Sequence, residues 1–318
     1  MTILCFYNHY HNGDLFVSKG YVSYICNQLR SKNVKFEYLH ENHIKVLADL
    51  PAQSLPLKND PIMHLPETRF KKVFSNNGKI YVNTWVGPYL SEYSQDKIVI
   101  GIGGSINYLS FFDIFNHIIN ELNIVSGWDL MPLIDVWQGI PEVSKDLYNN
   151  FEVENFIRSN DFHLRVLISN GQVLCNQSWN NHNMINYFLP MIEHFDNIQW
   201  IFSYPTGINK HNVAHTNDIF LPQGSRCDLN EISLLSEHCD LIIGRHSGPF
   251  HFCNTKINLL NSNKTFISIG KHSGHAFPFR MSVPADFYYL EDKNDNAVKF
   301  FLETLVTNYL IFKKPFET

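Results

Sequence analysis

The sequence has few charged residues and no long apolar run. Charged residues make up 17% of the 318 residues, and the formal net charge is −5. Nucleic-acid-binding proteins normally present a strongly basic face, so this balance argues against a nucleic-acid partner. No apolar run approaches the ~20 residues that a membrane span needs, and the first residues lack the basic start of a signal peptide. We therefore expect no transmembrane segment, although peripheral contact with a membrane stays open.

The cysteines also show no pattern typical of a disulfide scaffold or a zinc site. There are six of them, scattered and without a Cys-x-x-Cys pair. This pattern argues against structural zinc and against a disulfide scaffold, so a reducing, cytoplasmic location is expected. The hydrophobic content of 44% supports large buried cores rather than disorder. At roughly 150 residues per domain, the length predicts about two domains.

The first half begins with the pattern of a βαβ unit. Residues 2–7 form a short apolar run that suits a strand buried on both faces. Polar and turn-forming residues follow, and from Asp14 the apolar residues recur at helical spacing. Further along this half, strands are expected at 34–39, 79–85 and 97–102 and a helix at 106–124.

The second half alternates strands and helices more regularly. Strands are expected near 164–169, 199–203, 218–221, 240–243 and 265–269, and helices near 181–195, 228–237, 249–260 and 294–311. This alternation predicts a parallel sheet with crossover helices. The fold class is therefore α/β, with Rossmann-like domains over residues 1–160 and 161–318. The last helix is expected either within the second domain or packed back on the first.

In open parallel sheets, ligands bind beyond the carboxyl ends of the strands. The most informative loop of this kind is Ser247-Gly248-Pro249-Phe250-His251, which follows the strand 240–243 and Gly244. Proline suits the first position of a helix, and glycine lets a ligand approach the backbone closely. Free amides at a helix start favour a phosphate, to which His251 could donate. The alternative is that the segment is only a helix start and His251 only a packed side chain.

Two segments resemble the lipopolysaccharide heptosyltransferase family of glycosyltransferases (glycosyltransferase family 9). Cys239–Gly244 with Ser247–His251 matches its C-terminal signature, and Gly13-Asp14 is similar to its N-terminal Gly-Asp loop. The resemblance implies a GT-B fold, in which two Rossmann-like domains face each other across an interdomain cleft. His246 stands where the family has an acid that belongs to donor recognition, so heptose itself is not implied.

The resemblance also implies an activity: inverting transfer of a hexosyl or heptosyl group from a nucleotide-sugar to a hydroxyl of a glycan or glycolipid. The N-terminal domain would bind the acceptor, with Asp14 as the catalytic base, and Gly13 and His11 would line the cleft. The C-terminal domain would bind the donor. Its candidate donor- and phosphate-binding residues are Ser247, Gly248, His251, His246, Arg245 and Arg226.

No metal ion or other cofactor is expected. The sequence has no Asp-x-Asp motif of the metal-dependent type, and Asp292-Lys-Asn-Asp295 is better interpreted as the cap of the last helix. Helix amides and cationic side chains would then stabilise the departing diphosphate.

Several alternatives remain open from the residues alone. Asp14 could merely cap its helix. Gly101–Ser105 resembles part of a dinucleotide fingerprint, which would make the protein an NAD-dependent oxidoreductase. A non-catalytic carbohydrate-binding relative of a transferase is a third alternative. Trp85, Trp128 and Trp179 could stack on sugar or base rings, or belong to the core.

Overall fold

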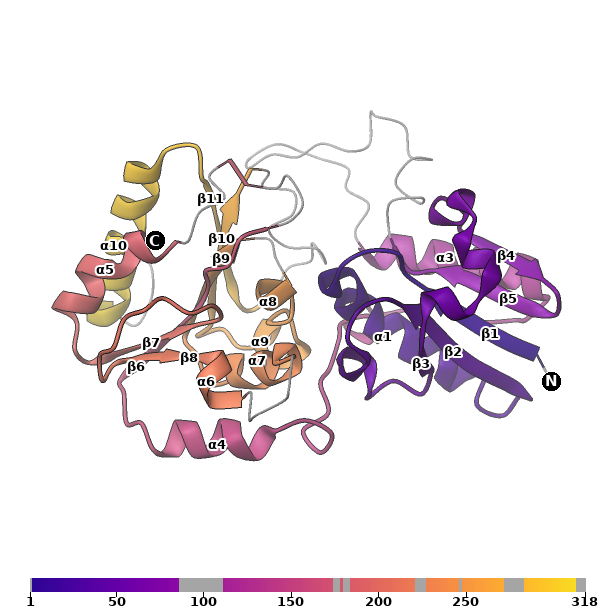
Figure 1. The fold of residues 1–318 in the computed structure, drawn as a ribbon, viewed down its shortest axis with the longest axis horizontal. Coiled ribbons are helices and arrows are strands. Elements are labelled where there is room, and N and C mark those ends of the chain that lie inside the picture. Colours follow the sequence, from indigo (N-terminus) through magenta and orange to yellow (C-terminus); the bar gives the residue numbers. More distant parts are fainter. Residues whose placement is uncertain are drawn as a thin grey trace. The chain divides into compact units, whose positions relative to one another are not determined.

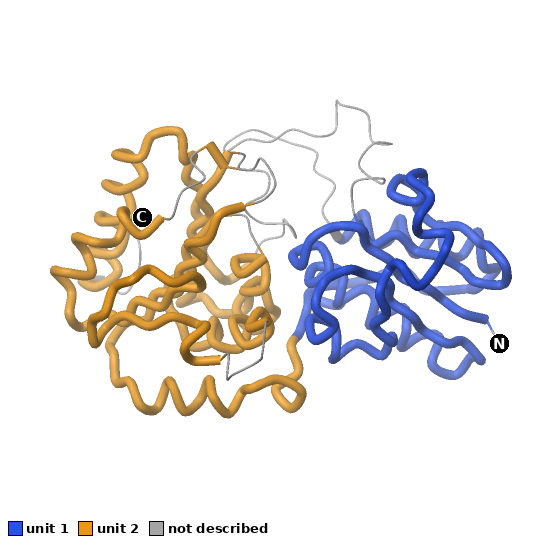
Figure 2. Tube along the Cα trace, in the orientation of Figure 1, with its two compact units in different colours: residues 1–142, 278–281 blue, residues 143–277, 282–318 orange. Residues whose placement is uncertain are grey.

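The computed structural model describes residues 2–85, 111–173, 178–179, 184–220, 227–245, 248–271 and 283–312. Two compact units divide between Glu142 and Val143 (Figure 2). The boundary predicted at 160 therefore lies too far along the chain for these units. Helix α4 (Asn150–Arg158) precedes it but packs against α6 (Thr216–Phe220) and α7 (Leu229–Ser236), which places α4 in the second unit.

The first unit is built on a five-stranded sheet of order β3-β2-β1-β5-β4. Its strands are β1 (Thr2–Tyr7), β2 (Val34–His40), β3 (Gln53–Pro56), β4 (Val73–Asn76) and β5 (Lys79–Asn83), and its helices are α1 (Asn12–Gln28) and α3 (Phe111–Ser126). Four short 3-10 turns lie between Ile44 and Arg69, and a fifth spans Val136–Gln138. The expected strand at 97–102 lies outside the described residues.

The side chains of β1 alternate between the two faces of this sheet, and both faces are buried. Cys5 and Tyr7 pack on one face with Leu57 and Met63 from the 3-10 turns. Phe6 points to the other face, where its ring lies 6.1 Å from that of Tyr38. Because both faces are covered, β1 is apolar at nearly every position, as expected for a central parallel strand.

One strand pair of the first sheet is antiparallel. β4 pairs with β5 through a tight turn at Asn77-Gly78, where both residues have positive φ angles of 48° and 78°. A two-residue turn of this kind requires a left-handed backbone, and Asn-Gly is the dipeptide that adopts it most readily. No hairpin was predicted from the sequence here, although this dipeptide is a hairpin signal.

The second unit contains a six-stranded sheet of order β11-β10-β9-β6-β7-β8, with all neighbouring strands parallel. The strands are β6 (Leu164–Ser169), β7 (Ile198–Phe202), β8 (Val213–His215), β9 (Leu241–Arg245), β10 (Thr265–Gly270) and β11 (Asp286–Glu291). Besides α4, α6 and α7, the helices are α5 (Ile185–His194), α8 (Gly248–His251), α9 (Lys256–Leu259) and α10 (Asp295–Phe312).

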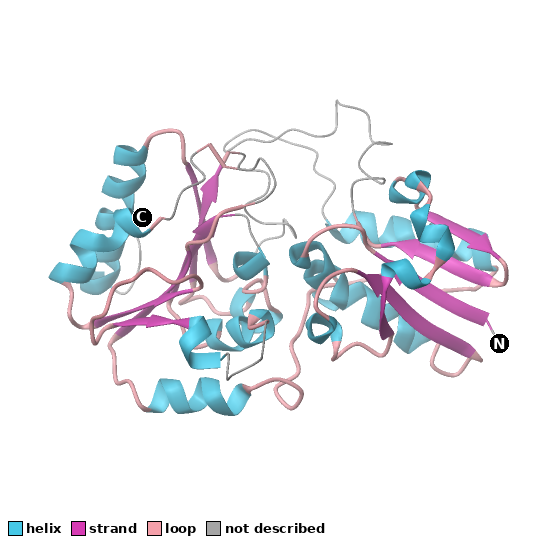
Figure 3. Ribbon diagram, in the orientation of Figure 1, coloured by secondary structure: helices cyan, strands magenta, loops and turns pink. Residues whose placement is uncertain are grey.

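Helices cover both faces of this sheet (Figures 1 and 3). α5 and α10 lie on one face, where Trp200 is fully buried in a core with side chains of both helices. α6, α7, α8 and α9 lie on the other face. α10 therefore packs on the core of the second unit, which is one of the two locations expected for the last helix. Two Rossmann-like α/β units with largely parallel sheets confirm the predicted fold class.

Three expectations in the second half were wrong in detail. Residues 218–221 were expected to form a strand, but the strand is β8, and the chain turns into α6 at Thr216, whose hydroxyl donates to Asp228 Oδ2 at 2.6 Å. The helix expected over 249–260 is broken into α8 and α9, because Thr255 is extended and caps α9. β11 was missed, although its Phe-Tyr-Tyr-Leu run has the composition of a strand.

No helix among the described residues combines the length and the apolar character needed to cross a membrane.

Candidate functional site

The first cluster of candidate residues lies where β1 ends and α1 begins. His11 is the N-cap of α1 and is exposed, while Gly13 is buried and Asp14 half-buried in the first turn. Asp14 Oδ2 accepts a hydrogen bond from the backbone amide of His11 at 3.3 Å. Asp14 thus caps its helix, as one interpretation of the sequence held.

The environment of Asp14 also changes its proton affinity. Burial raises the pKa of the Asp14 carboxyl above its ordinary value, and the hydrogen bond and charge of His11 oppose that rise only in part. A carboxylate that is poorly solvated holds a proton more strongly. Asp14 is therefore a better proton acceptor than an exposed aspartate.

Buried polar groups hold the loop that precedes Asp14. Asn8 is fully buried, donates to Thr84 Oγ1 at 3.0 Å and accepts from the Tyr10 amide at 2.8 Å. The Tyr38 hydroxyl lies 2.6 Å from Thr84 Oγ1 and 2.9 Å from Ser18 Oγ. These bonds join β1, β2, α1 and the end of β5. The carboxyl edge of this sheet is therefore a rigid support for Asp14.

In the second unit, the loop after β9 carries the other candidate residues. Gly248 and His251 bound the short helix α8, which Phe250 anchors to the sheet with no exposure to solvent. Since α8 has a single turn, its dipole is weaker than that of the long helix expected from the sequence. Backbone amides and His251 remain as donors at this position. Ser247, His246 and Arg226 lie outside the described residues, as does the Gly101–Ser105 segment of the oxidoreductase alternative.

Arg245, the last residue of β9, is placed differently from its prediction. Its side chain is fully buried, and Nη1 lies 3.5 Å from the Gly171 carbonyl oxygen. Burial lowers the pKa of the Arg245 guanidinium, while Tyr187, Asp292 and Asp295 oppose that shift electrostatically. The charges of these groups offset part of the cost of burying the Arg245 cation.

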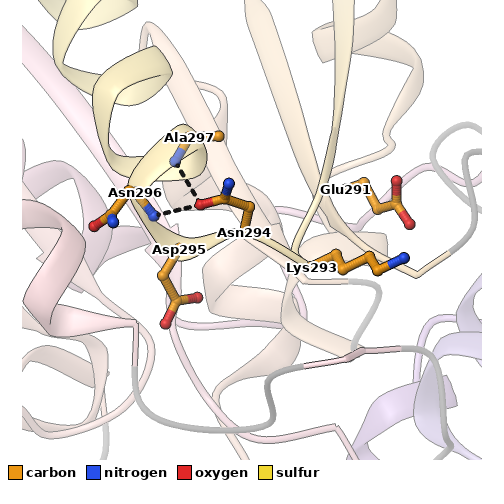
Figure 4. Close-up of a pocket in the computed structure, with 6 residues that line it drawn as sticks. All are labelled: Glu291, Lys293, Asn294, Asp295, Asn296 and Ala297. Atoms are coloured by element: carbon orange, nitrogen blue, oxygen red, sulfur yellow. Dashed lines mark hydrogen bonds between the residues drawn. The ribbon is translucent and has the colours of Figure 1, made fainter.

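The segment Asp292-Lys-Asn-Asp295 was predicted to cap the last helix, and it does so, although neither aspartate is the capping residue. The cap of α10 is Asn294, whose Oδ1 accepts from the amides of Asn296 and Ala297 at 3.1 and 3.2 Å (Figure 4). Asp295 instead accepts from the Tyr187 hydroxyl at 2.6 Å. Asp292 is fully buried and accepts from the Trp179 amide at 2.9 Å and from the Ser178 hydroxyl.

A cavity of about 670 Å³ lies beside this cluster (Figure 4). It is lined by Glu291, Lys293, Asn294, Asp295, Asn296 and Ala297. Figure 4 shows Lys293 extending away from the helix on the same side as Glu291, whereas Asp295 points elsewhere. The cavity therefore lies where β11 gives way to α10, at the carboxyl edge at which α/β sheets bind ligands.

Within the described segments, no group of three or more His, Cys, Asp or Glu side chains is arranged to hold a metal ion.

Comparisons with known proteins identify the fold. No protein-family model and no curated protein matches the sequence. Among solved structures, the ADP-heptose lipopolysaccharide heptosyltransferase II of E. coli matches with a TM-score of 0.53 at 13% identity, over 98% of this chain and 100% of that chain. A family 9 glycosyl transferase from Veillonella parvula matches with a TM-score of 0.50 at 11% identity, over 95% of this chain and 91% of that one. The chain thus has the GT-B fold and resembles family 9 glycosyltransferases.

Proposed function

We propose that this protein is a glycosyltransferase that moves a sugar from a nucleotide-sugar to a hydroxyl of a glycan or glycolipid, with inversion and without a metal ion. The observation that carries the proposal is the likeness of nearly the whole chain to a heptosyltransferase whose name specifies ADP-heptose. Asp14, at the start of α1 with a raised pKa, supplies the basic group that such a reaction needs.

In the proposed reaction, an acceptor hydroxyl attacks the anomeric carbon of the donor. The new carbon–oxygen bond forms as the bond from that carbon to the diphosphate oxygen breaks. Asp14 takes the hydroxyl proton, and the nucleoside diphosphate leaves with the bonding electron pair. Attack on the face opposite the leaving group inverts the configuration at the anomeric carbon.

The second unit would bind the donor. The amides at Gly248 and the side chains of Ser247 and His251 would contact the diphosphate and stabilise the charge that develops on it. His246 and Arg226 are further proposed cationic contacts. Arg245 is not counted among these contacts, because its side chain is fully buried.

The pH dependence of the rate offers a first prediction. Only the ionised Asp14 can accept a proton, so kcat/KM should fall as pH decreases through its pKa. Because burial raises that pKa, the fall should begin at a higher pH than the value of about 3.9 for an exposed aspartate would give. A pH series of initial rates measures this. An acidic limb centred at the ordinary aspartate value would contradict the assignment.

A second prediction concerns His251. Replacement of His251 by Ala should weaken binding of the nucleoside diphosphate roughly tenfold or more, because a hydrogen bond to a charged group is lost. Calorimetric titration measures the change, and His194→Ala on α5 is a matched control. Equal affinities of the wild type and H251A would remove His251 from the donor site.

The nucleotide itself can be identified by thermal shift. One nucleoside diphosphate among UDP, GDP, ADP and CDP should stabilise the protein equally with and without EDTA. Stabilisation by NAD instead would support the oxidoreductase alternative, and loss of the shift in EDTA would contradict metal independence. The proposed location is the cytoplasm, since five described cysteines are buried and form no disulfide among the described residues; a glycolipid acceptor would bring the enzyme to a membrane surface.

A further inference from the structure

Trp179 is a large aromatic side chain that is held in place but left open to solvent. Its side chain is 48% exposed. Its backbone amide donates to the fully buried Asp292, and the preceding Ser178 donates to the same carboxylate. An exposed tryptophan with a fixed backbone loses little conformational entropy when a ligand stacks on it, which favours a role in binding.

Two ammonium groups lie near the Trp179 ring. Lys271 Nζ is 4.1 Å from the ring centroid, and Lys293 Nζ is 6.0 Å from it. The attraction of cations to the face of the indole explains these positions. Both lysines carry flexible side chains, so a flat ligand can displace them from the ring and keep them as hydrogen-bond donors.

The chain topology places this group at a ligand-binding edge. Lys271 follows β10, Lys293 follows β11, and Trp179 belongs to the connection after β6. These strands are parallel, so their carboxyl ends lie along one edge of the sheet. Lys293 also lines the cavity of about 670 Å³ described above, whose other polar groups include Glu291 and Asn296.

We propose that Trp179 is the stacking platform for the base of the donor nucleotide, with Lys271 and Lys293 donating to its carbonyl or phosphate oxygens. This inference rests on the proposed function. A nucleotide combines the flat ring that an indole face accepts with phosphate oxygens, and in every base but adenine a carbonyl oxygen, that accept hydrogen bonds from ammonium groups. Stacking on an aromatic side chain tolerates any base, so the platform sets affinity and the polar groups of the cavity set the choice of base.

The test compares two replacements of Trp179 by titration with UDP, GDP, ADP and CDP. Phe keeps an aromatic face, whereas Leu is apolar but cannot stack. We expect W179L to bind its preferred nucleoside diphosphate about 10- to 100-fold more weakly than the wild type, and W179F to stay within a few-fold of it. F151A, which removes another exposed aromatic of the same unit, should bind like the wild type.

Each outcome separates the inference from the function on which it rests. Equal affinities of W179F and W179L, whether both strong or both weak, would overturn stacking and leave the transferase proposal standing. Failure of the wild type to bind any of the four nucleotides would overturn both. Thermal unfolding of the ligand-free variants should show the same Tm, because the replaced side chain is half exposed.

Discussion

Replacement of Asp14 by Asn should lower the transfer rate by about 10²- to 10⁴-fold, the range that a positioned general base contributes. Asparagine has nearly the same shape as aspartate but cannot accept the proton of the acceptor hydroxyl. The nucleotide should bind D14N as it binds the wild type, because Asp14 belongs to the first unit and the proposed donor residues to the second. Release of nucleoside diphosphate measures the rate, and titration measures the affinity.

The Asn variant also separates catalysis from helix capping. Its side-chain oxygen can still accept the hydrogen bond from the His11 amide. The raised pKa means that folding disfavours ionised Asp14, so the fold becomes less stable as pH rises from the ordinary aspartate pKa to the raised one, and the loss stays constant above it. At neutral pH, D14N should therefore be as stable as the wild type or more stable, and the difference should vanish at low pH.

Two further variants complete this experiment. D14A removes the capping acceptor as well, at a cost of about 0.5–1.5 kcal/mol in unfolding free energy. D113N changes another first-turn aspartate of the same unit, on α3, and should leave the rate unchanged. Full turnover by D14N would exclude Asp14 as the base, and would support the non-catalytic or capping interpretation of this residue.

The second large effect is expected at Gly244, where a methyl group has no room. A Cβ atom at this position would lie 2.5 Å from the Ser169 Cβ and 3.2 Å from Phe250 Cδ2. Gly244 pairs with Ser169 across β6 and β9, so neither backbone can move without weakening the sheet. G244A should therefore lose about 1–3 kcal/mol of unfolding free energy, and the Tm of the protein should fall by several degrees.

The same variant should weaken nucleotide binding, because Phe250 anchors the turn that carries His251. G171A is a matched control, since a Cβ at Gly171 meets nothing within 4 Å. Adding S169G to G244A removes the closer of the two contacts and should restore part of the lost stability. A wild-type Tm for G244A, measured by thermal unfolding, would contradict the close approach of β6 and β9.

The parts of the fold that the sequence predicted are those with strong local patterns. β1, β6 and β10 are predominantly apolar because they are largely buried on both faces, and apolar residues recur at roughly helical spacing after Asp14. The wrong secondary-structure predictions have local causes that the spacing of apolar residues does not report. α8 ends at His251 and Thr255 caps α9, a break that apolar spacing alone does not reveal.

The candidate site was less predictable because its contacts join residues far apart in the sequence. Arg245 was predicted as a donor-binding cation next to a glycine-containing turn. It is buried instead, and Asp292 and Asp295, which follow β11 and begin α10, act on its charge. Asp292 and its partners Ser178 and Trp179 likewise come from segments far apart in the sequence. The Gly-Asp and Ser-Gly-x-x-His motifs, in contrast, were recognisable because each is local.

The most direct measurement of the central claim is turnover of nucleotide-sugars by the wild-type protein. Purified protein would be incubated with UDP-, GDP- and ADP-sugars and glycan or glycolipid acceptors in EDTA, and the products analysed by NMR. We predict acceptor-dependent release of one nucleoside diphosphate and a product with inverted anomeric configuration. Absence of release from every donor, or a product that retains the donor configuration, would contradict an inverting transferase.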